Sequence, residues 1–248
     1  MPSLEIKGFV EASFSDWDGK VSTVVFFPGC NLRCPFCQNG DLILRPAELP
    51  TVAFASLSGY LERHRGWIDG VVLTGGEPTL LDGLADFVRS IRALGLEIKL
   101  DTNGTNPRVI EDLFGAGLVD YTAMDVKAPL DERYHRAAGV RVDIGEIRRS
   151  IEVVRSRGQD SYEFRTTLVP GLVGEDDVME IARSLEGAAR YVLQKFMPDK
   201  CLDTSLRRAI PFTDAAAHDL ARRATAHVGS CFYRGKAGTI LSLPQGPD

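Results

Sequence analysis

The chain has 248 residues, a formal net charge of −5, 44% hydrophobic residues and 25% charged residues. These proportions are ordinary for a soluble globular protein that is long enough to bury a core without disulfides. The acidic balance gives no general attraction to nucleic acid or to an anionic membrane. We expect neither a membrane span nor a signal peptide, because no apolar run reaches about 18 residues and acids interrupt the first twenty positions. Five cysteines, three of them close together, argue against a secreted disulfide framework and predict a cytoplasmic protein.

Short strands alternate with helices along the whole chain. Apolar or alternating runs predict strands over 21–27, 69–74, 96–101, 118–124, 162–169 and 191–196. Helical spacing and end signals predict helices over 52–65, 80–94, from Pro107 after Asn106, from 144 after a cap at Asp143, over 175–186, and over 214–227 after a cap at Thr213. Strands separated by helices pair in parallel through right-handed crossovers.

The order of these elements predicts the α/β class. The simplest architecture is a single partial or complete (β/α) barrel of about six parallel strands, and a doubly wound open sheet is the alternative. We expect one domain over 1–248, in which segment 1–20 leads into the barrel and 197–248 forms a C-terminal extension. In either architecture ligands bind at the C-terminal ends of the strands. The loops to inspect are therefore 28–40, 75–79, 102–106, 125–131, 169–174 and 197–212.

The loop after the first predicted strand reads GCNLRCPFCQN and holds Cys30, Cys34 and Cys37 in the spacing C-x3-C-x2-C. Thiolates are soft ligands that suit iron–sulfur clusters, zinc or copper(I). A structural zinc site closes with four ligands, whereas Cys201 and Cys231 lie more than 160 residues further along the chain. A [4Fe–4S] cluster on three thiolates leaves one iron open to a small molecule. Zinc and a metal-free thiol cluster remain as alternatives.

Two further loops carry residues suited to a ligand. TGGEP follows the second strand, where Gly75 and Gly76 allow close backbone approach, Glu77 offers a carboxylate to an ammonium, and Pro78 fixes the exit into the next helix. A tight turn with a helix-capping glutamate is the simpler alternative. DTNG follows the third strand, and its polar groups can bind ribose hydroxyls or a carboxylate, although Asn-Gly is also an ordinary turn signal. The polar residues of this second loop are Asp101, Thr102 and Asn103.

The next two strands end in MDVK and RTTLVPG. Asp125 and Lys127 can form a buried ion pair or contact a ligand at the end of the fourth strand. Leu168 and Val169 precede Pro170-Gly171, which is equally consistent with a simple turn.

The cysteine spacing, with Phe36 before the third cysteine, resembles the signature of the radical S-adenosylmethionine (radical SAM) superfamily. The TGGEP, DTNG, DVK and VPG-like segments, with Asp16–Lys20 before the first strand, are similar to glycyl-radical-enzyme activating proteins. Anaerobic ribonucleoside-triphosphate reductase activating proteins are the most similar type. Gln38 departs from the histidine that many relatives carry. The resemblance implies a radical SAM type of barrel with one [4Fe–4S] cluster on Cys30, Cys34 and Cys37. It also implies S-adenosylmethionine bound by Phe36, Gly75, Gly76, Glu77, Pro78, Asp101, Thr102, Asn103, Asp125, Lys127, Leu168 and Val169.

The same resemblance implies an activity. S-adenosylmethionine is cleaved reductively to a 5′-deoxyadenosyl radical, which takes a hydrogen atom from a glycine of a partner glycyl radical enzyme such as anaerobic ribonucleotide reductase. A flavodoxin or ferredoxin-type protein supplies the electron. One alternative is a radical SAM enzyme that modifies a small molecule, a peptide or RNA. The other is a non-catalytic iron–sulfur or zinc protein.

Several conspicuous residues have no predicted role in the site. We expect Cys201 to be a loop cysteine, Cys231 a core residue, and Trp17 and Trp67 packing residues. The histidines share no ligand spacing, which predicts surface or helix-face positions for His64, His135, His218 and His227.

Overall fold

The computed structural model of the chain describes residues 4–235 and 240–241. Nine strands form one sheet in which each strand pairs with the next in sequence. Seven of them, β2 to β8, pair in parallel, while β1 and β9 add antiparallel edges. The strands are β1 (Gly8–Ser13), β2 (Ser22–Phe27), β3 (Gly70–Gly75), β4 (Glu97–Thr102), β5 (Tyr121–Asp125), β6 (Tyr162–Leu168), β7 (Tyr191–Lys195), β8 (Cys231–Arg234) and β9 (Ile240–Leu241).

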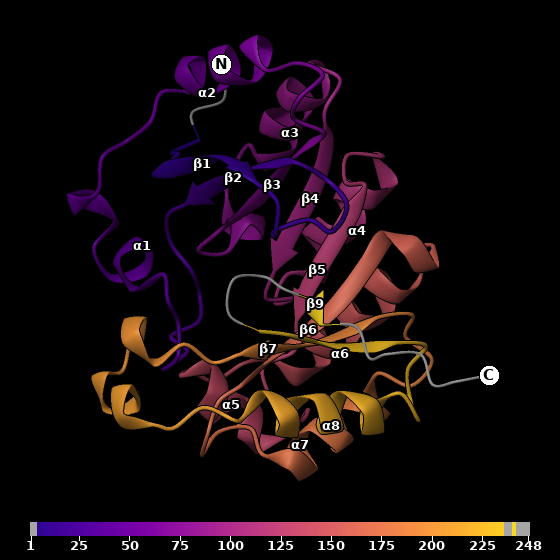
Figure 1. Cartoon of the computed structure of the whole chain (residues 1–248). Coiled ribbons are helices and arrows are strands. Elements are labelled where there is room, and N and C mark those ends of the chain that lie inside the picture. Colours follow the sequence, from indigo (N-terminus) through magenta and orange to yellow (C-terminus); the bar gives the residue numbers. More distant parts are fainter. Residues whose placement is uncertain (1–3, 236–239, 242–248) are drawn as a thin grey trace.

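Helices connect the parallel strands and lie around the outer side of the curved sheet (Figure 1). Thr213 and Asp143 cap α8 and α6 through their side chains as expected, whereas the Asn106 side chain donates to the Thr79 carbonyl instead of capping α4. The helices are α1 (Gly40–Leu44), α2 (Phe54–Arg63), α3 (Leu84–Arg92), α4 (Pro107–Gly115), α5 (Glu132–Ala138), α6 (Ile144–Arg155), α7 (Glu175–Ser184) and α8 (Asp214–Ala224).

The predicted α/β class and the parallel partial barrel are confirmed. All six predicted strands and the six predicted helices occur, with ends shifted by a few residues. The sequence analysis did not anticipate β1, α1, α5, β8 or β9. The α8–β8 unit adds a parallel strand from within the expected C-terminal extension, whose residues 236–239 and 242–248 lie outside the described part of the chain.

The apolar core lies between the sheet and its helices, in two large clusters. One cluster joins β2, β3 and β4 to α2 and α3, and the other joins β5, β6 and β7 to the later helices. The inner side of the sheet is less apolar than this core. Few apolar residues meet there, among them Trp17, Val24 and Val72, and charged side chains lie beside them. Trp17 packs as expected, but the same expectation for Trp67 is wrong, since 73% of its surface is exposed.

The loop between β1 and β2 joins the two ends of the open barrel. Within the described residues the sheet stays open, because β1 and β9 are its two edges. Asp18 in this loop accepts a hydrogen bond from Arg190, which precedes β7, and lies 3.5 Å from Arg234 of β8. The backbone carbonyl of Asp16 accepts from the buried ammonium of Lys99 in β4. Side-chain pairs therefore hold the barrel together where strand pairing does not.

No helix among the described residues is long and apolar enough to cross a membrane.

The Asp18 pairs predict a measurable contribution to stability. We expect Asp18→Ala to lower the free energy of unfolding by about 1–2 kcal/mol, because it removes one of the two carboxylate partners of two largely buried guanidinium groups. Urea unfolding of the variant and the parent measures the difference. Asp219→Ala is the control: its partner Arg222 is mostly exposed, so its loss should cost less than about 0.5 kcal/mol. Equal effects of the two substitutions would contradict this role.

Candidate functional site

A cavity of about 370 Å³ lies at the C-terminal ends of the parallel strands. Of the predicted site residues, all but Pro78, Leu168 and Val169 line it. Pro78 is buried at the start of the 3₁₀ turn Pro78–Leu80, and the side chains of Leu168 and Val169 are buried in the apolar core. The roles of these three residues stay predictions. The lining residues predicted from sequence are Cys30, Cys34, Phe36, Cys37, Gly75, Gly76, Glu77, Asp101, Thr102, Asn103, Asp125 and Lys127.

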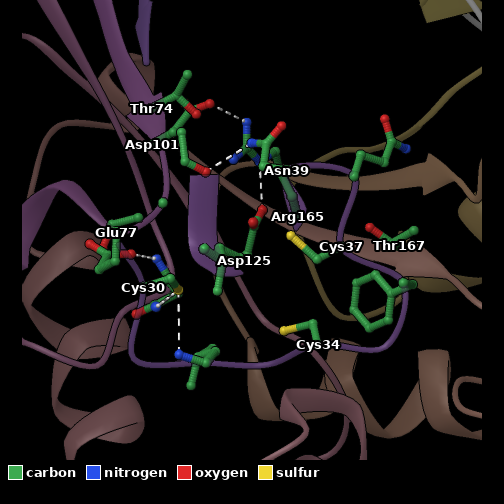
Figure 2. Close-up of a pocket in the computed structure, with 18 of the residues that line it drawn as sticks. Cys30, Cys34, Cys37, Asn39, Thr74, Glu77, Asp101, Asp125, Arg165 and Thr167 are labelled. Carbon is green, nitrogen blue, oxygen red and sulfur yellow. Dashed lines mark hydrogen bonds and ion pairs between the residues drawn. The ribbon is translucent and has the colours of Figure 1, made fainter. Parts of the chain in front are cut away.

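The three loop cysteines face this cavity as free thiols. Figure 2 shows the three cysteines around one side of the cavity, with Glu77 on the side of Cys30. The Cys30 sulfur accepts from the Leu32 amide at 3.4 Å and from Asn103 Nδ2 at 3.7 Å. Burial raises the pKa of all three thiols, that of Cys34 to about 11, so they are neutral in the metal-free protein. Metal binding would therefore release protons.

The donor set fits a metal cluster with three protein ligands. Among the described residues no three His, Cys, Asp or Glu side chains gather closely enough to hold a single metal ion, whereas the thiolates of an iron–sulfur cluster bind to separate irons. Neither of the other two cysteines lines the cavity. Cys201 is buried with its thiol 3.5 Å from the Met197 carbonyl, and Cys231 is buried in β8 as expected for a core residue. Three soft ligands on one short loop favour iron–sulfur chemistry over a four-ligand zinc site.

The TGGEP turn lies directly against the start of the cysteine loop. A Cβ atom on Gly76 would lie 1.6 Å from the Gly29 carbonyl oxygen, so only glycine fits at this position. The Glu77 amide donates to the same carbonyl at 2.8 Å, and the Gly76 amide donates to the Phe27 carbonyl at 2.9 Å. Asn39 Nδ2 donates to the Gly75 carbonyl at 2.8 Å from the other end of the loop. Gly75 and Gly76 therefore let the TGGEP turn pack directly against the cysteine loop.

Glu77 holds the ends of β3 and β4 together. Its carboxylate is 1% exposed and accepts from Thr79 Oγ1 at 2.6 Å, from Thr102 Oγ1 at 2.8 Å and from the Asn103 amide at 2.6 Å. Burial raises the pKa of Glu77, although these donors favour the ionised form. Among the described residues Oε2 accepts one donor, the Asn103 amide, so it keeps further acceptor capacity, and the predicted contact of Glu77 with a ligand ammonium stays a prediction.

Charged side chains from neighbouring strands meet on the inner wall of the cavity. Arg165 of β6 donates through Nε to Asp125 at 2.8 Å and through Nη1 to Asp101 at 3.1 Å (Figure 2). Lys127 donates to the second oxygen of Asp125 at 2.8 Å. Burial alone would raise the pKa of Asp125, but Arg165 and Lys127 lower it to about 2. The expected ion pair of Asp125 and Lys127 is therefore present.

Two outer segments hold the cysteine loop in place. The Arg33 amide donates to the Ala138 carbonyl at the end of α5, at 2.8 Å, and a Cβ on Gly139 would lie 2.0 Å from the Arg33 carbonyl. On another side, the Asp203 amide donates to the Pro35 carbonyl at 2.8 Å. The loop is thus held at its middle, away from the sulfur atoms.

Sequence reasoning missed several polar lining residues, and most of them, unlike Asn39, lie on strands or outside the inspected loops. Arg165 and Thr167 share one face of β6 with Glu163, so period-two alternation in EFRTT was the signal that could have found them. None of the four histidines lines the cavity, in agreement with their predicted positions. The missed lining residues include Asp16, Asn39, Arg165, Thr167, Gln194 and Lys195.

Comparisons with known proteins agree with this geometry. A model of the radical SAM superfamily matches residues 24–185. A protein of Methanocaldococcus jannaschii, provisionally named a glycyl-radical enzyme activating enzyme, is 32% identical over 239 residues, which cover 95% of this chain and 98% of that protein. The 7-carboxy-7-deazaguanine synthase of Thermococcus kodakarensis is 25% identical over 92% of this chain and 97% of its own length.

Solved structures show the same fold at low identity. TYW1 with a lysine–pyruvate adduct bound has a TM-score of 0.57 at 16% identity, over 83% of this chain and 73% of that one. Streptococcus suis SuiB bound to its precursor peptide SuiA has a TM-score of 0.56 at 15% identity, over 82% of this chain and 44% of that one. At these identities the likeness is one of fold alone.

The pairing of Asp125 predicts a pH dependence of stability. Its pKa is lower in the folded chain, about 2 against 3.8, so its stabilising effect is present above about pH 4 and is lost as pH falls towards 2. Asp125→Asn lacks this titration. We expect the stability difference between parent and variant to shrink by about 1 kcal/mol between about pH 5 and about pH 3. Urea unfolding of the cluster-free proteins at both pH values measures it, and parallel curves would refute the pairing.

The cysteines predict a second outcome. After anaerobic reconstitution with iron and sulfide, we expect the triple alanine variant of Cys30, Cys34 and Cys37 to lack the cluster absorbance of the parent. Cys201→Ala and Cys231→Ala should keep the parent's iron and sulfide content, because neither thiol lines the cavity. Loss of the cluster in either single variant would mean that all four corners have protein ligands, leaving no open iron.

Proposed function

The chain belongs to the radical SAM superfamily, and from this premise we propose that it activates a glycyl radical enzyme by taking a hydrogen atom from a glycine of that partner. Its cofactors would be one [4Fe–4S] cluster and S-adenosylmethionine. The partner proposed is an anaerobic ribonucleotide reductase, and the electron donor a flavodoxin or ferredoxin. The five free cysteines suit a reducing cytoplasm.

The cavity residues divide into those that would hold the cluster and those that would hold the nucleoside. Cys30, Cys34 and Cys37 would hold the cluster. When bound, the cluster and S-adenosylmethionine supply the one-electron cleavage that creates a carbon radical at the 5′ position. Gly75 and Gly76 expose backbone at the cavity, and the free acceptor capacity of Glu77 suits the ammonium of an amino acid.

The inner charged residues would orient the rest of the nucleoside. Asp101 and Asp125 are held in place by Arg165, so a hydroxyl-bearing ligand would meet acceptors that are already oriented. The Lys127 ammonium donates one of its hydrogen bonds to Asp125, so only its other N–H groups are available to a ligand.

A protein substrate is supported by similarity over the full length and by the shape of the site. The chain aligns over nearly all of the provisionally named activating enzyme. Ligand cavities run from roughly 300 to 1,000 Å³, so one of about 370 Å³ lies near the small end of that range. Leu44 and Ile210, 58% and 86% exposed, lie in the segments that follow β2 and β7, two of the strands whose C-terminal ends lie at the cavity. Exposed apolar residues there suit contact with a partner protein.

A small-molecule substrate is the second candidate. The similarity to 7-carboxy-7-deazaguanine synthase also covers nearly the whole of both chains, although at lower identity. The residues proposed to hold the cluster and S-adenosylmethionine would serve either candidate, so they do not separate the two.

The test of the proposal uses the reconstituted, reduced protein with S-adenosylmethionine, with and without the anaerobic ribonucleotide reductase of the same organism. We expect 5′-deoxyadenosine in both mixtures and the electron paramagnetic resonance doublet of a glycyl radical only when the reductase is present. The triple cysteine variant is the control and should give neither signal.

Two outcomes would contradict the proposal at different levels. Deoxyadenosine without any glycyl radical would reject the activase and leave the small-molecule candidate. Absence of deoxyadenosine from protein that carries a full cluster would reject radical SAM activity altogether.

A further inference from the structure

Asn103 directly follows β4 and makes contact with both Glu77 and Cys30. Its backbone amide donates to Glu77 Oε2 at 2.6 Å, and its side-chain Nδ2 donates to the Cys30 sulfur at 3.7 Å. The residue is 6% exposed, and Cys30 and Glu77 lie on the same side of the cavity (Figure 2). Asn103 therefore lies between a residue proposed to hold the cluster and one proposed to hold an amino acid.

Every polar group of the Asn103 side chain has a partner in the folded chain. Nδ2 also donates to Asn31 Oδ1 at 3.0 Å, and Oδ1 accepts from the amide of Thr105 at 3.0 Å and from its hydroxyl at 2.7 Å. A carboxamide offers two N–H donors and one oxygen with two lone pairs, so these contacts use all of them. A contact of Asn103 with the nucleoside, as the DTNG loop predicts, would therefore fall to its backbone.

Thr105 fixes which way the Asn103 amide points. A backbone N–H is always a donor, so the atom that accepts from the Thr105 amide must be the oxygen, and the nitrogen must face Cys30. Asn31 Nδ2 donates to Thr105 Oγ1 at 2.8 Å and completes a ring of three side chains. Asn31 immediately follows Cys30, so this ring joins the cysteine loop to the segment after β4.

We propose that the Asn103 side chain donates a hydrogen bond to the cluster-bound sulfur of Cys30 and thereby raises the reduction potential of the cluster. The inference rests on the presence of the cluster in the proposed function. A thiolate is a stronger acceptor than a neutral thiol, so the contact seen in the metal-free chain gains strength when the cluster is bound. Hydrogen bonds to the sulfurs favour the more negative, reduced state and are among the factors that set the potential of iron–sulfur centres.

Asn103 is the side chain through which this effect can be tested. In the described part of the chain, no other side chain donates a hydrogen bond to Cys30, Cys34 or Cys37. The Leu32 amide donates to Cys30 at 3.4 Å, but it belongs to the backbone and persists when side chains are changed. Asn103 is a positioning and tuning residue, because it acts through Cys30.

The test compares Asn103→Ala and Asn103→Leu with the parent in the reconstituted holoprotein. Both variants lack the donor, and leucine keeps the branched shape of the side chain. Redox titration followed by electron paramagnetic resonance measures the midpoint potential without any substrate. We expect the ratio of reduced to oxidised cluster at a fixed potential to fall about fivefold, as for the loss of one net hydrogen bond. For a one-electron couple this corresponds to a midpoint about 40 mV more negative.

Asn106→Ala is the matched control. Asn106 lies three residues further along the chain, and its Nδ2 donates to the Thr79 carbonyl at 3.0 Å. The substitution removes a side-chain amide from the same loop without removing a donor to sulfur, so the midpoint should equal that of the parent. Iron and sulfide content, measured on every sample, shows whether each variant is equally loaded.

The outcomes separate this inference from the proposed function. Equal midpoints in the parent and the Asn103 variants, at equal cluster content, would overturn the tuning role and leave the enzyme proposal intact. An equal shift in Asn106→Ala would also overturn it, because the effect would then belong to the loop as a whole. Loss of the cluster from both Asn103 variants would overturn it too, since Asn103 would then be needed to assemble the site. A parent protein that never acquires a cluster would instead reject the proposed function.

Discussion

Arg165 connects the two halves of the sheet on the inside of the barrel. One guanidinium joins Asp101 of β4 to Asp125 of β5, and Lys99 and Lys127 extend the line of alternating charge on either side. Taking so many charges out of water is costly unless each is paired, so the geometry of neighbouring strands is tightly constrained. The cavity wall is therefore rigid before any ligand enters, and its acceptors are oriented by the protein itself.

The same principle explains how an open barrel keeps its shape. Strand pairing ends at β1 and β9 in the described chain, so backbone hydrogen bonds do not close the ring. Asp18, in the loop after β1, reaches Arg190 and Arg234 on the far side, and those two arginines also lie close to Glu163.

The cysteine loop depends on backbone contacts more than on its own side chains. Gly29 touches Gly76, Arg33 binds the end of α5, and Pro35 accepts from Asp203. These anchors act on the backbone of the loop, whose three cysteines line the cavity. A structural role for α5 and the segment around Asp203 is thus to hold a loop that has no regular secondary structure between residues 28 and 39.

Much of the fold and of the site could be predicted from local patterns. The alternation of apolar strands with amphipathic helices determined a parallel α/β sheet, because helix-length connections leave no antiparallel option. That rule, with the cysteine spacing and the polar loop residues, predicted one site at the strand ends. Local patterns were insufficient for β1 and α5, since a short edge strand and a seven-residue helix carry weak periodic signals. The place of Arg165 in the site was not predicted, because inspection of the loops alone misses residues that face inwards from a strand.

By itself, the sequence determined which chemical groups are present and in which loops, since spacing along the chain is a local property. It determined three thiols on one loop, a glycine pair beside them, and carboxylates at the ends of the next strands. Only the tertiary structure decided which groups meet: Arg165 with two carboxylates, Asp18 with two arginines, and Asn39 with the Gly75 carbonyl. Such pairs join positions between 36 and 216 residues apart, and their partners are selected by sheet order and helix packing, which no local pattern encodes.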